Sequence, residues 1–193
     1  MRNSTTKLLI AILLLATSSA AIAHPGHNAS GLTAGLMHPF SGLDHLLAML
    51  AVGLWAAQCG GRRIWLLPVT FMTMLAFGSG IATYWQSLPL AEPGIAASVL
   101  MLGLLVALSL QLHALLSVMI IALFGLLHGY AHGLELPESA APAAYALGFL
   151  AATAMLHLSG IAAGVAAHKR SADLVKAFGV ATAASGAYLL VSI

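Results

Sequence analysis

Six long apolar segments dominate this sequence, and they constrain the fold more than any other feature. Each is close to the roughly 20 residues that an α-helix needs to cross the hydrocarbon core of a bilayer. Only 6% of the residues are charged, whereas soluble domains carry about 25%. We therefore predict an all-α polytopic membrane protein, folded as a bundle of six transmembrane helices. The predicted spans are 31–58, 64–84, 94–112, 114–132, 141–167 and 174–192.

The N-terminal residues resemble a secretory signal peptide. A basic region precedes a short apolar stretch and a small-x-small cleavage pattern. We expect residues 1–23 to be removed, so that the mature chain starts at His24 and 31–193 forms the transmembrane domain. An uncleaved extra span is the alternative, and the short apolar stretch disfavours it. The pattern consists of Arg2 and Lys7, the apolar stretch 8–16 and Ala21-Ile22-Ala23.

Basic residues orient the predicted spans. After the signal peptide, every Lys and Arg falls in the loops that follow spans one and five, and three glutamates fall on the other side. Cytoplasmic loops carry an excess of Lys and Arg, and a signal peptide places the mature N-terminus outside. Both arguments predict that both mature termini lie outside, on the side opposite the cytoplasm. The basic residues are Arg62, Arg63, Lys169, Arg170 and Lys176; the glutamates are Glu92, Glu135 and Glu138.

The remaining composition excludes several classes of protein. A single cysteine, Cys59, cannot form an intramolecular disulfide or a Cys-rich metal site. The net charge of +2 is too small to indicate a nucleic-acid partner. No glycine-rich phosphate-binding motif is present, so we expect no ATP hydrolysis. The oligomeric state is not predicted.

A few ionisable residues lie inside or at the ends of the predicted spans. An Asp near the centre of a membrane helix costs about 2.5–3.5 kcal/mol, so each such residue suggests a function. These residues are His38, Asp44 and His45 in span one, His128 and His132 in span four with Glu135 at its outer end, and His157 in span five.

In span one, the motif HPFSGLDH places His38 and His45 two turns apart, on one face of an unbroken helix. Asp44 would then point away from His38. Pro39 and Gly42 are poor helix formers, and we expect them to bend or unwind the segment so that Asp44 turns toward the histidines. Irregular backbone survives in a membrane only against protein or a wet cavity.

In span four, His128, His132 and Glu135 follow one another at i, i+4 and i+7, which makes a single stripe on one helix face. Gly129 and Gly133 leave room beside this stripe. Small residues at four-residue spacing also let membrane helices approach closely.

The predicted topology places both motifs in the periplasmic half of the membrane, where their side chains can meet. Imidazole and carboxylate groups suit a borderline divalent cation such as Ni, Zn, Cu or Fe, and the absence of thiolates argues against Cu(I). We predict one shared metal site made by the six polar side chains of the two motifs. A proton relay through the same groups is the alternative.

Three further histidines are candidates for a pathway or for metal capture. His157 lies roughly 24 Å along span five, deeper toward the cytoplasm, and is either a pathway ligand or a group that hydrogen-bonds two helices. His24 and His27 belong to a short extracytoplasmic leader, residues 24–30. This leader is either a metal-capture arm or simply polar chain after the cleavage site.

The two motifs resemble those of the HupE/UreJ family of nickel/cobalt permeases. Residues 38–45 match His-Pro-x-x-Gly-x-Asp-His, and residues 127–135 match Phe-His-Gly-x-Ala-His-Gly-x-Glu with Leu127 in place of Phe. The resemblance covers essentially the whole mature chain. It implies ATP-independent uptake of Ni²⁺ or Co²⁺ across a bacterial inner membrane, with both mature termini in the periplasm and Zn²⁺ as a surrogate ion. It also implies metallochaperones of hydrogenase, urease or cobalamin assembly as downstream partners.

Two other functions remain open beside a permease. One is a membrane metal-binding accessory or sensor protein that does not transport. The other is an intramembrane hydrolase using Ser79, but Phe77 stands where the Gly-x-Ser-Gly of rhomboid proteases needs glycine. No His-Glu-x-x-His of a metalloprotease is present either. We therefore expect no enzyme and no catalytic residues, and interpret Ser79 as a packing residue.

Overall fold

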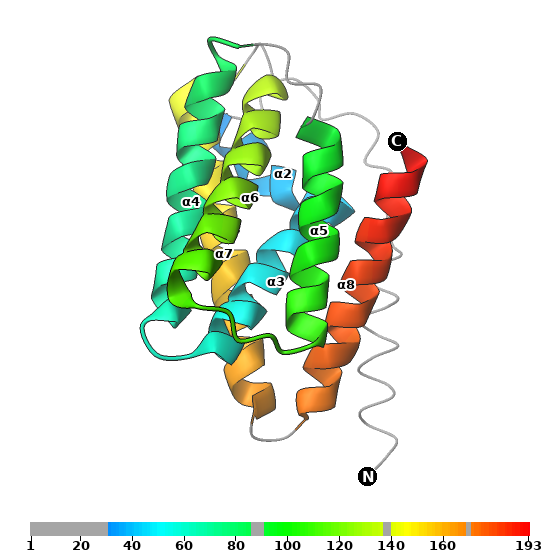
Figure 1. The fold of residues 1–193 in the computed structure, drawn as a ribbon. Helices are drawn as coiled ribbons and strands as arrows, with labels where there is room; N and C mark the ends of the chain where they lie inside the picture. The colour runs from blue at the N-terminus through cyan, green and yellow to red at the C-terminus, as the bar shows by residue number, and fades with distance from the viewer. Residues whose placement is uncertain (1–30, 86–90, 137–139, 169–170) are drawn as a thin grey trace.

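The computed structural model describes residues 31–85, 91–136, 140–168 and 171–193, and all regular structure in these ranges is helical. This confirms the predicted all-α class. The predicted signal peptide and the leader with His24 and His27 lie outside the described residues. The helices of the described ranges are α2 (Gly31–Ser41), α3 (Leu43–Cys59), α4 (Arg63–Ala82), α5 (Ala91–Ala107), α6 (Ala114–Leu134), α7 (Pro142–His168) and α8 (Ala172–Ser192) (Figure 1).

The first predicted span is two helices instead of one. α2 and α3 meet at Gly42 and are bent by 83° relative to each other. Gly42 has an extended backbone, with φ −106° and ψ 123°, so the helical hydrogen-bond ladder is interrupted there. Pro39 is buried inside α2, and the helix continues through it to Ser41. Of the two residues expected to distort the segment, Gly42 is therefore the one at which the chain turns.

The structure describes a multi-pass membrane protein. Four described helices, α4, α6, α7 and α8, are long and apolar enough to cross a membrane. The bent pair α2 and α3 makes a fifth candidate if it counts as one span. α5 is apolar but has only 17 residues, which is the short end of the range for a transmembrane helix. The described residues thus contain four or five candidate spans, where the sequence predicted six.

The predicted end of the third span is wrong. We expected this span to continue to residue 112, but α5 ends at Ala107. Ser109 has φ 49°, in the left-handed region that non-glycine residues seldom occupy. The Leu110 N–H donates to the Leu105 carbonyl at 3.0 Å, which closes a turn. The apolar run continues beyond the helix, so hydrophobicity alone could not locate this end.

α3 is the central helix of the bundle. It packs against α2, α4, α5, α7 and α8. A helix that is apolar on all sides is a buried helix, and the sequence of α3 after His45 fits this rule. The Trp55 Nε1–H donates to the Leu110 carbonyl, so its polar atom is satisfied. The α3 side chains that are at most 5% exposed are Ala48, Met49, Ala51, Val52, Leu54, Trp55 and Ala56.

Glycines hold the helices together in pairs. α4 packs on α6, α5 on α8, and both α2 and α3 on α7. Gly78 of α4 lies against the α6 backbone, Gly103 of α5 against α8, and Gly53 of α3 against α7. Inside a membrane there is little hydrophobic drive between helices, so close van der Waals contact between backbones becomes a main source of association.

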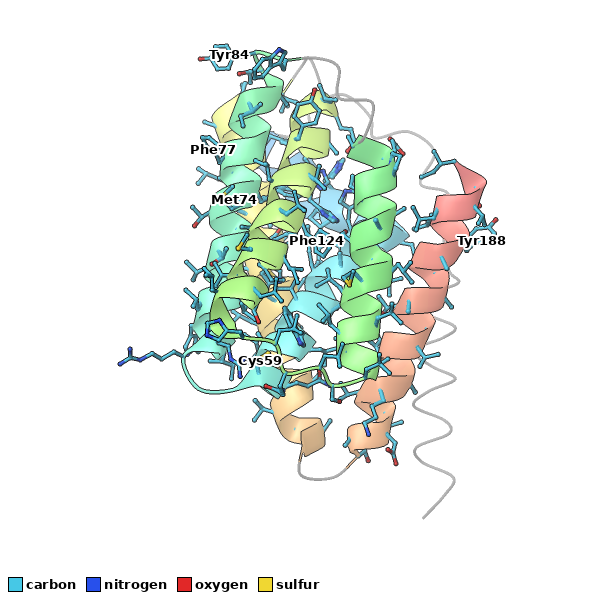
Figure 2. All side chains as sticks on the ribbon, in the orientation of Figure 1. Cys59, Met74, Phe77, Tyr84, Phe124 and Tyr188 are labelled. Carbon is cyan, nitrogen blue, oxygen red and sulfur yellow. The ribbon has the colours of Figure 1, made fainter. Side chains whose placement is uncertain are left out.

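The two ends of the bundle differ in charge. Figure 2 labels Tyr84 at one end and Cys59 at the other, and we name the ends after these residues. The C-terminus lies at the Tyr84 end (Figure 1). The described basic residues Arg62, Arg63 and Lys176 are at the Cys59 end, and Glu92 and Glu135 are at the Tyr84 end. The described basic residues and glutamates therefore lie at opposite ends, as the sequence predicted, and Asp173 lies with the basic residues.

Two glycines of α4 provide a matched test of this packing. We expect Gly78→Ala to lower the free energy of unfolding by about 1–3 kcal/mol, the usual cost of overpacking, because a Cβ there would collide with the backbone of Leu126. Gly80→Ala meets nothing within 4 Å and should be neutral or slightly stabilising, since alanine is the better helix former. Thermal unfolding in detergent measures both variants. Equal melting temperatures would contradict the proposed role of Gly78.

Candidate metal site

The bend at Gly42 and the last turns of α6 bring the histidines of the two motifs together. The ring centroid of His132 lies 4.7 Å from that of His38 and 4.2 Å from that of His45. The His45 ring is also 5.2 Å from the His128 ring. These four residues, from α2, α3 and α6, form one histidine cluster in the half of the bundle toward the Tyr84 end.

His38, His132 and Glu135 form the outer triad of this cluster. One ligand atom of each lies within 4.8 Å of the other two. The Glu135 Oε2 accepts a hydrogen bond from the His38 Nε2 at 3.0 Å and lies 3.4 Å from the His132 Nδ1. The Glu135 side chain is 48% exposed, whereas that of His132 is 1% exposed. A cation arriving from the Tyr84 end therefore meets the carboxylate first.

Glu135 follows the last residue of α6 and is ionised at neutral pH. The neighbouring imidazoles, His132 first and then His38, lower the pKa of its carboxyl group below the ordinary value. Burial acts in the opposite direction but is outweighed. The outer triad thus combines one negative charge with two nitrogen donors.

Asp44 is the partner of His45 and not a member of the outer triad. Its Oδ1 accepts hydrogen bonds from the His45 backbone N–H at 2.9 Å and from the His45 Nδ1 at 2.7 Å. Because a carboxylate only accepts, the Nδ1 carries the proton and the Nε2 keeps its lone pair. Carboxylate partners of this kind orient imidazoles that bind metals. The bend therefore turns Asp44 toward a histidine, as we expected, and that histidine is its neighbour in sequence.

Several imidazole nitrogens of the cluster are buried without a hydrogen-bond partner among the described residues. They are the Nε2 atoms of His45 and His128 and both ring nitrogens of His132. The Nδ1 of His128 donates to the Phe124 carbonyl at 2.9 Å, so only its Nε2 is unpartnered. An unsatisfied buried polar atom costs about 1–3 kcal/mol. So many in one place indicate that these nitrogens bind something, and their chemistry fits a borderline divalent cation.

The glycines of the two motifs have different roles. A Cβ on Gly42 would lie 2.6 Å from the Asp44 Oδ1 and 2.8 Å from the His45 Nδ1, so only glycine leaves room for this pair. Gly129 and Gly133 instead pack against the backbone of Leu75 and Ser79 on α4. Gly133 also lies beside His132 in the wall of a cavity, whereas at Gly129 the neighbouring backbone belongs to α4.

His157 lies outside the cluster. It is fully buried on α7, and its Nδ1 donates to the Met49 carbonyl at 2.8 Å. The ring of Phe71 lies 5.2 Å from that of His157 and 5.5 Å from that of His128. Phe71 therefore contacts both His157 and the inner edge of the cluster.

Aromatic side chains around the cluster were missed by the sequence analysis. The Phe149 ring lies 4.0 Å from the His132 ring, and the Tyr145 ring lies 5.7 Å from the His38 ring. Both residues are on α7, and no motif distinguishes them from ordinary aromatic core residues. A cavity of about 300 Å³ lies between α4, α6 and α7, with His132, Tyr145 and Phe149 in its wall. The outer triad therefore borders open space as well as protein.

Comparisons with known proteins match almost the whole chain. A family model described as HupE / UreJ protein matches residues 12–189. The chain is 42% identical over 187 residues to Protein HupE of Rhizobium leguminosarum bv. viciae, which covers 96% of this chain and 98% of that protein. No solved structure matches it. The family match includes both histidine motifs.

The fit of the Asp44–His45 pair around Gly42 leads to a prediction. We expect Gly42→Ala to weaken Ni²⁺ binding about 10–100-fold, the usual effect of disturbing a residue that orients a metal ligand. The backbone at Gly42 suits alanine, so the effect should come from contact with the pair. Isothermal titration of purified protein with Ni²⁺ measures it, with Gly80→Ala as the control. Unchanged affinity in Gly42→Ala would show that the pair does not support metal binding.

Proposed function

This chain belongs to the HupE/UreJ family, and from that premise we propose that it is a secondary permease that imports Ni²⁺ or Co²⁺ across a bacterial inner membrane. The family is of the transporter type and is associated with nickel or cobalt transport or an accessory role. An intramembrane hydrolase built on Ser79 is disfavoured on the same ground.

The observation that carries this proposal is the set of unpartnered imidazole nitrogens behind an exposed carboxylate. Mg²⁺ and Ca²⁺ prefer oxygen ligands, whereas imidazole binds Ni²⁺ and Zn²⁺ well. Glu135 attracts any divalent cation, and the nitrogens of His132, His45 and His128 then favour the borderline metals. The donor set therefore supports selection of Ni²⁺ or Co²⁺, with Zn²⁺ as a surrogate.

The charges at the two ends support an orientation in the membrane, and we propose the direction of transport from it. Basic residues mark the cytoplasmic side of membrane proteins, and Arg62, Arg63 and Lys176 are at the Cys59 end. In our proposal the Tyr84 end, with the outer triad, faces the periplasm, and the C-terminus is periplasmic. Ions would be taken up from the periplasm and released toward the cytoplasm, where metallochaperones for hydrogenase, urease or cobalamin assembly would receive them.

The side chains of the cluster have separate tasks in this proposal. Glu135 and His38 replace the first water ligands of the incoming ion at the surface. His132, in contact with both His38 and His45, offers one unprotonated nitrogen and passes the ion inward. Asp44 holds His45 in one orientation and supplies a second negative charge near the buried ion.

Uptake into proteoliposomes tests the proposed function. We expect Glu135→Gln to lower the initial rate of ⁶³Ni accumulation at least tenfold, because the amide keeps the shape but loses the charge that binds the cation first. Asp173→Asn, the same change in the first turn of α8 at the opposite end, should transport like the wild type. Excess Co²⁺ or Zn²⁺ should compete with nickel.

Each possible result of this assay decides between the functions considered above. Wild-type rates in Glu135→Gln would contradict the assignment of the outer triad. Nickel binding by the wild type without accumulation would replace the permease by the accessory or sensor function.

A further inference from the structure

Two buried imidazoles lie beyond the outer triad, toward the Cys59 end of the bundle. His128 of α6 is 0% exposed and His157 of α7 is 1% exposed. The Nε2 atoms of both lack a hydrogen-bond partner among the described residues. Both rings contact the same ring, that of Phe71, at 5.5 Å and 5.2 Å between centroids. Phe71 therefore contacts both imidazoles in the core of the bundle.

The backbone fixes which nitrogen of each ring is free. The Nδ1 of His128 hydrogen-bonds the Phe124 carbonyl at 2.9 Å, and the Nδ1 of His157 hydrogen-bonds the Met49 carbonyl at 2.8 Å. A carbonyl only accepts, so both Nδ1 atoms are protonated and both Nε2 atoms carry a lone pair. This backbone bond at one nitrogen is the usual way in which proteins orient an imidazole that binds metal through the other.

Close packing of α3 against α7 creates the His157 bond. Gly53 of α3 lies against the His157 carbonyl, and Gly160 of α7 lies against the Leu50 carbonyl. These contacts bring the Met49 carbonyl within reach of the His157 ring. A hydrogen bond between two helices needs only a donor, which a smaller polar residue provides. Histidine adds a second, unsatisfied nitrogen that costs about 1–3 kcal/mol when buried, so a purely structural role does not account for it.

His157 is too far along the bundle to bind an ion held by the outer triad. It lies about three turns beyond Tyr145 on α7, roughly 18 Å along the helix axis, and Tyr145 is the α7 residue beside His38. His128 lies between these levels, since its ring contacts both His45 and Phe71. A cation that reaches His128 therefore has His157 as the next unpartnered nitrogen toward the Cys59 end.

We propose that the Nε2 atoms of His128 and His157 form a second, inner binding position for the transported divalent cation. This inference rests on the proposed function and adds to it a route with two positions. His128 lies between the outer triad and His157, so the ion exchanges ligands one at a time instead of being released into the apolar core. Neither imidazole of the inner position hydrogen-bonds a carboxylate in the described residues, so this position holds a cation more weakly than the outer triad and allows it to move on.

The variant His157→Asn separates this role from a structural one. The asparagine Nδ2 can donate to the Met49 carbonyl in place of the histidine Nδ1, but the variant lacks the Nε2 lone pair. Thr182→Val is the matched control, because Thr182 is a fully buried residue of α8 whose hydroxyl is also unpartnered among the described residues. Size-exclusion elution and melting temperature establish that both variants fold.

Nickel stoichiometry and uptake are measured on the full-length chain. We expect the wild type and Thr182→Val to bind two Ni²⁺ ions and His157→Asn to bind one. In proteoliposomes His157→Asn should lose at least tenfold in uptake rate, while the affinity of the tighter site changes less than threefold. Two bound ions and normal uptake in His157→Asn would overturn the inner position.

Two further measurements keep the inference separate from the proposed function. If the wild type binds two ions but does not accumulate nickel, the permease fails while the inner position is supported. If His157→Asn does not fold, Glu135→Gln answers the question instead, because it weakens the outer triad and spares the inner pair. One remaining Ni²⁺ in Glu135→Gln supports the inner position, and none overturns it.

Discussion

Burial of imidazole nitrogens among apolar helices is the constraint on which the rest of this structure depends. Lipid and apolar side chains offer them no hydrogen bonds, so the protein must satisfy each nitrogen or reserve it for a ligand. In His45, His128 and His157, one nitrogen is bound by a carboxylate or a backbone carbonyl and the other is not. This division recurs on three different helices. The unpartnered nitrogens therefore form a series that leads inward from the exposed Glu135.

Close helix packing is what makes these bonds possible. A carbonyl inside a helix is already used by that helix, and another side chain reaches it only where the two backbones are close. Glycine supplies that approach between α3 and α7, and again between α4 and α6, where it fixes the position of the histidine stripe. The glycines therefore determine which backbone carbonyls the histidines can reach with a hydrogen bond.

Much of this arrangement could be predicted from the sequence, because periodicity along one helix is a local property. The stripe of His128, His132 and Glu135 follows from helical spacing alone. The exact turn in the first span did not follow, because Pro39 and Gly42 are both helix breakers and spacing along the chain does not choose between them. The end of α5 depends on a left-handed Ser109, which apolar composition does not reveal. The role of Gly129 and Gly133 depends on α4, a neighbour that no spacing rule identifies.

The short helix α2 divides the histidine cluster between two groups of packed helices. α2 packs chiefly on α7 through Gly35 and Gly148 and joins α3 only through the extended Gly42. His38 is therefore attached to α7, whereas its partner Glu135 is attached to the α4–α6 pair. Any separation of α7, with α2 packed on it, from that pair would break the His38–Glu135 hydrogen bond. The hydrogen bond between His38 and Glu135 thus also links two groups of helices in the bundle.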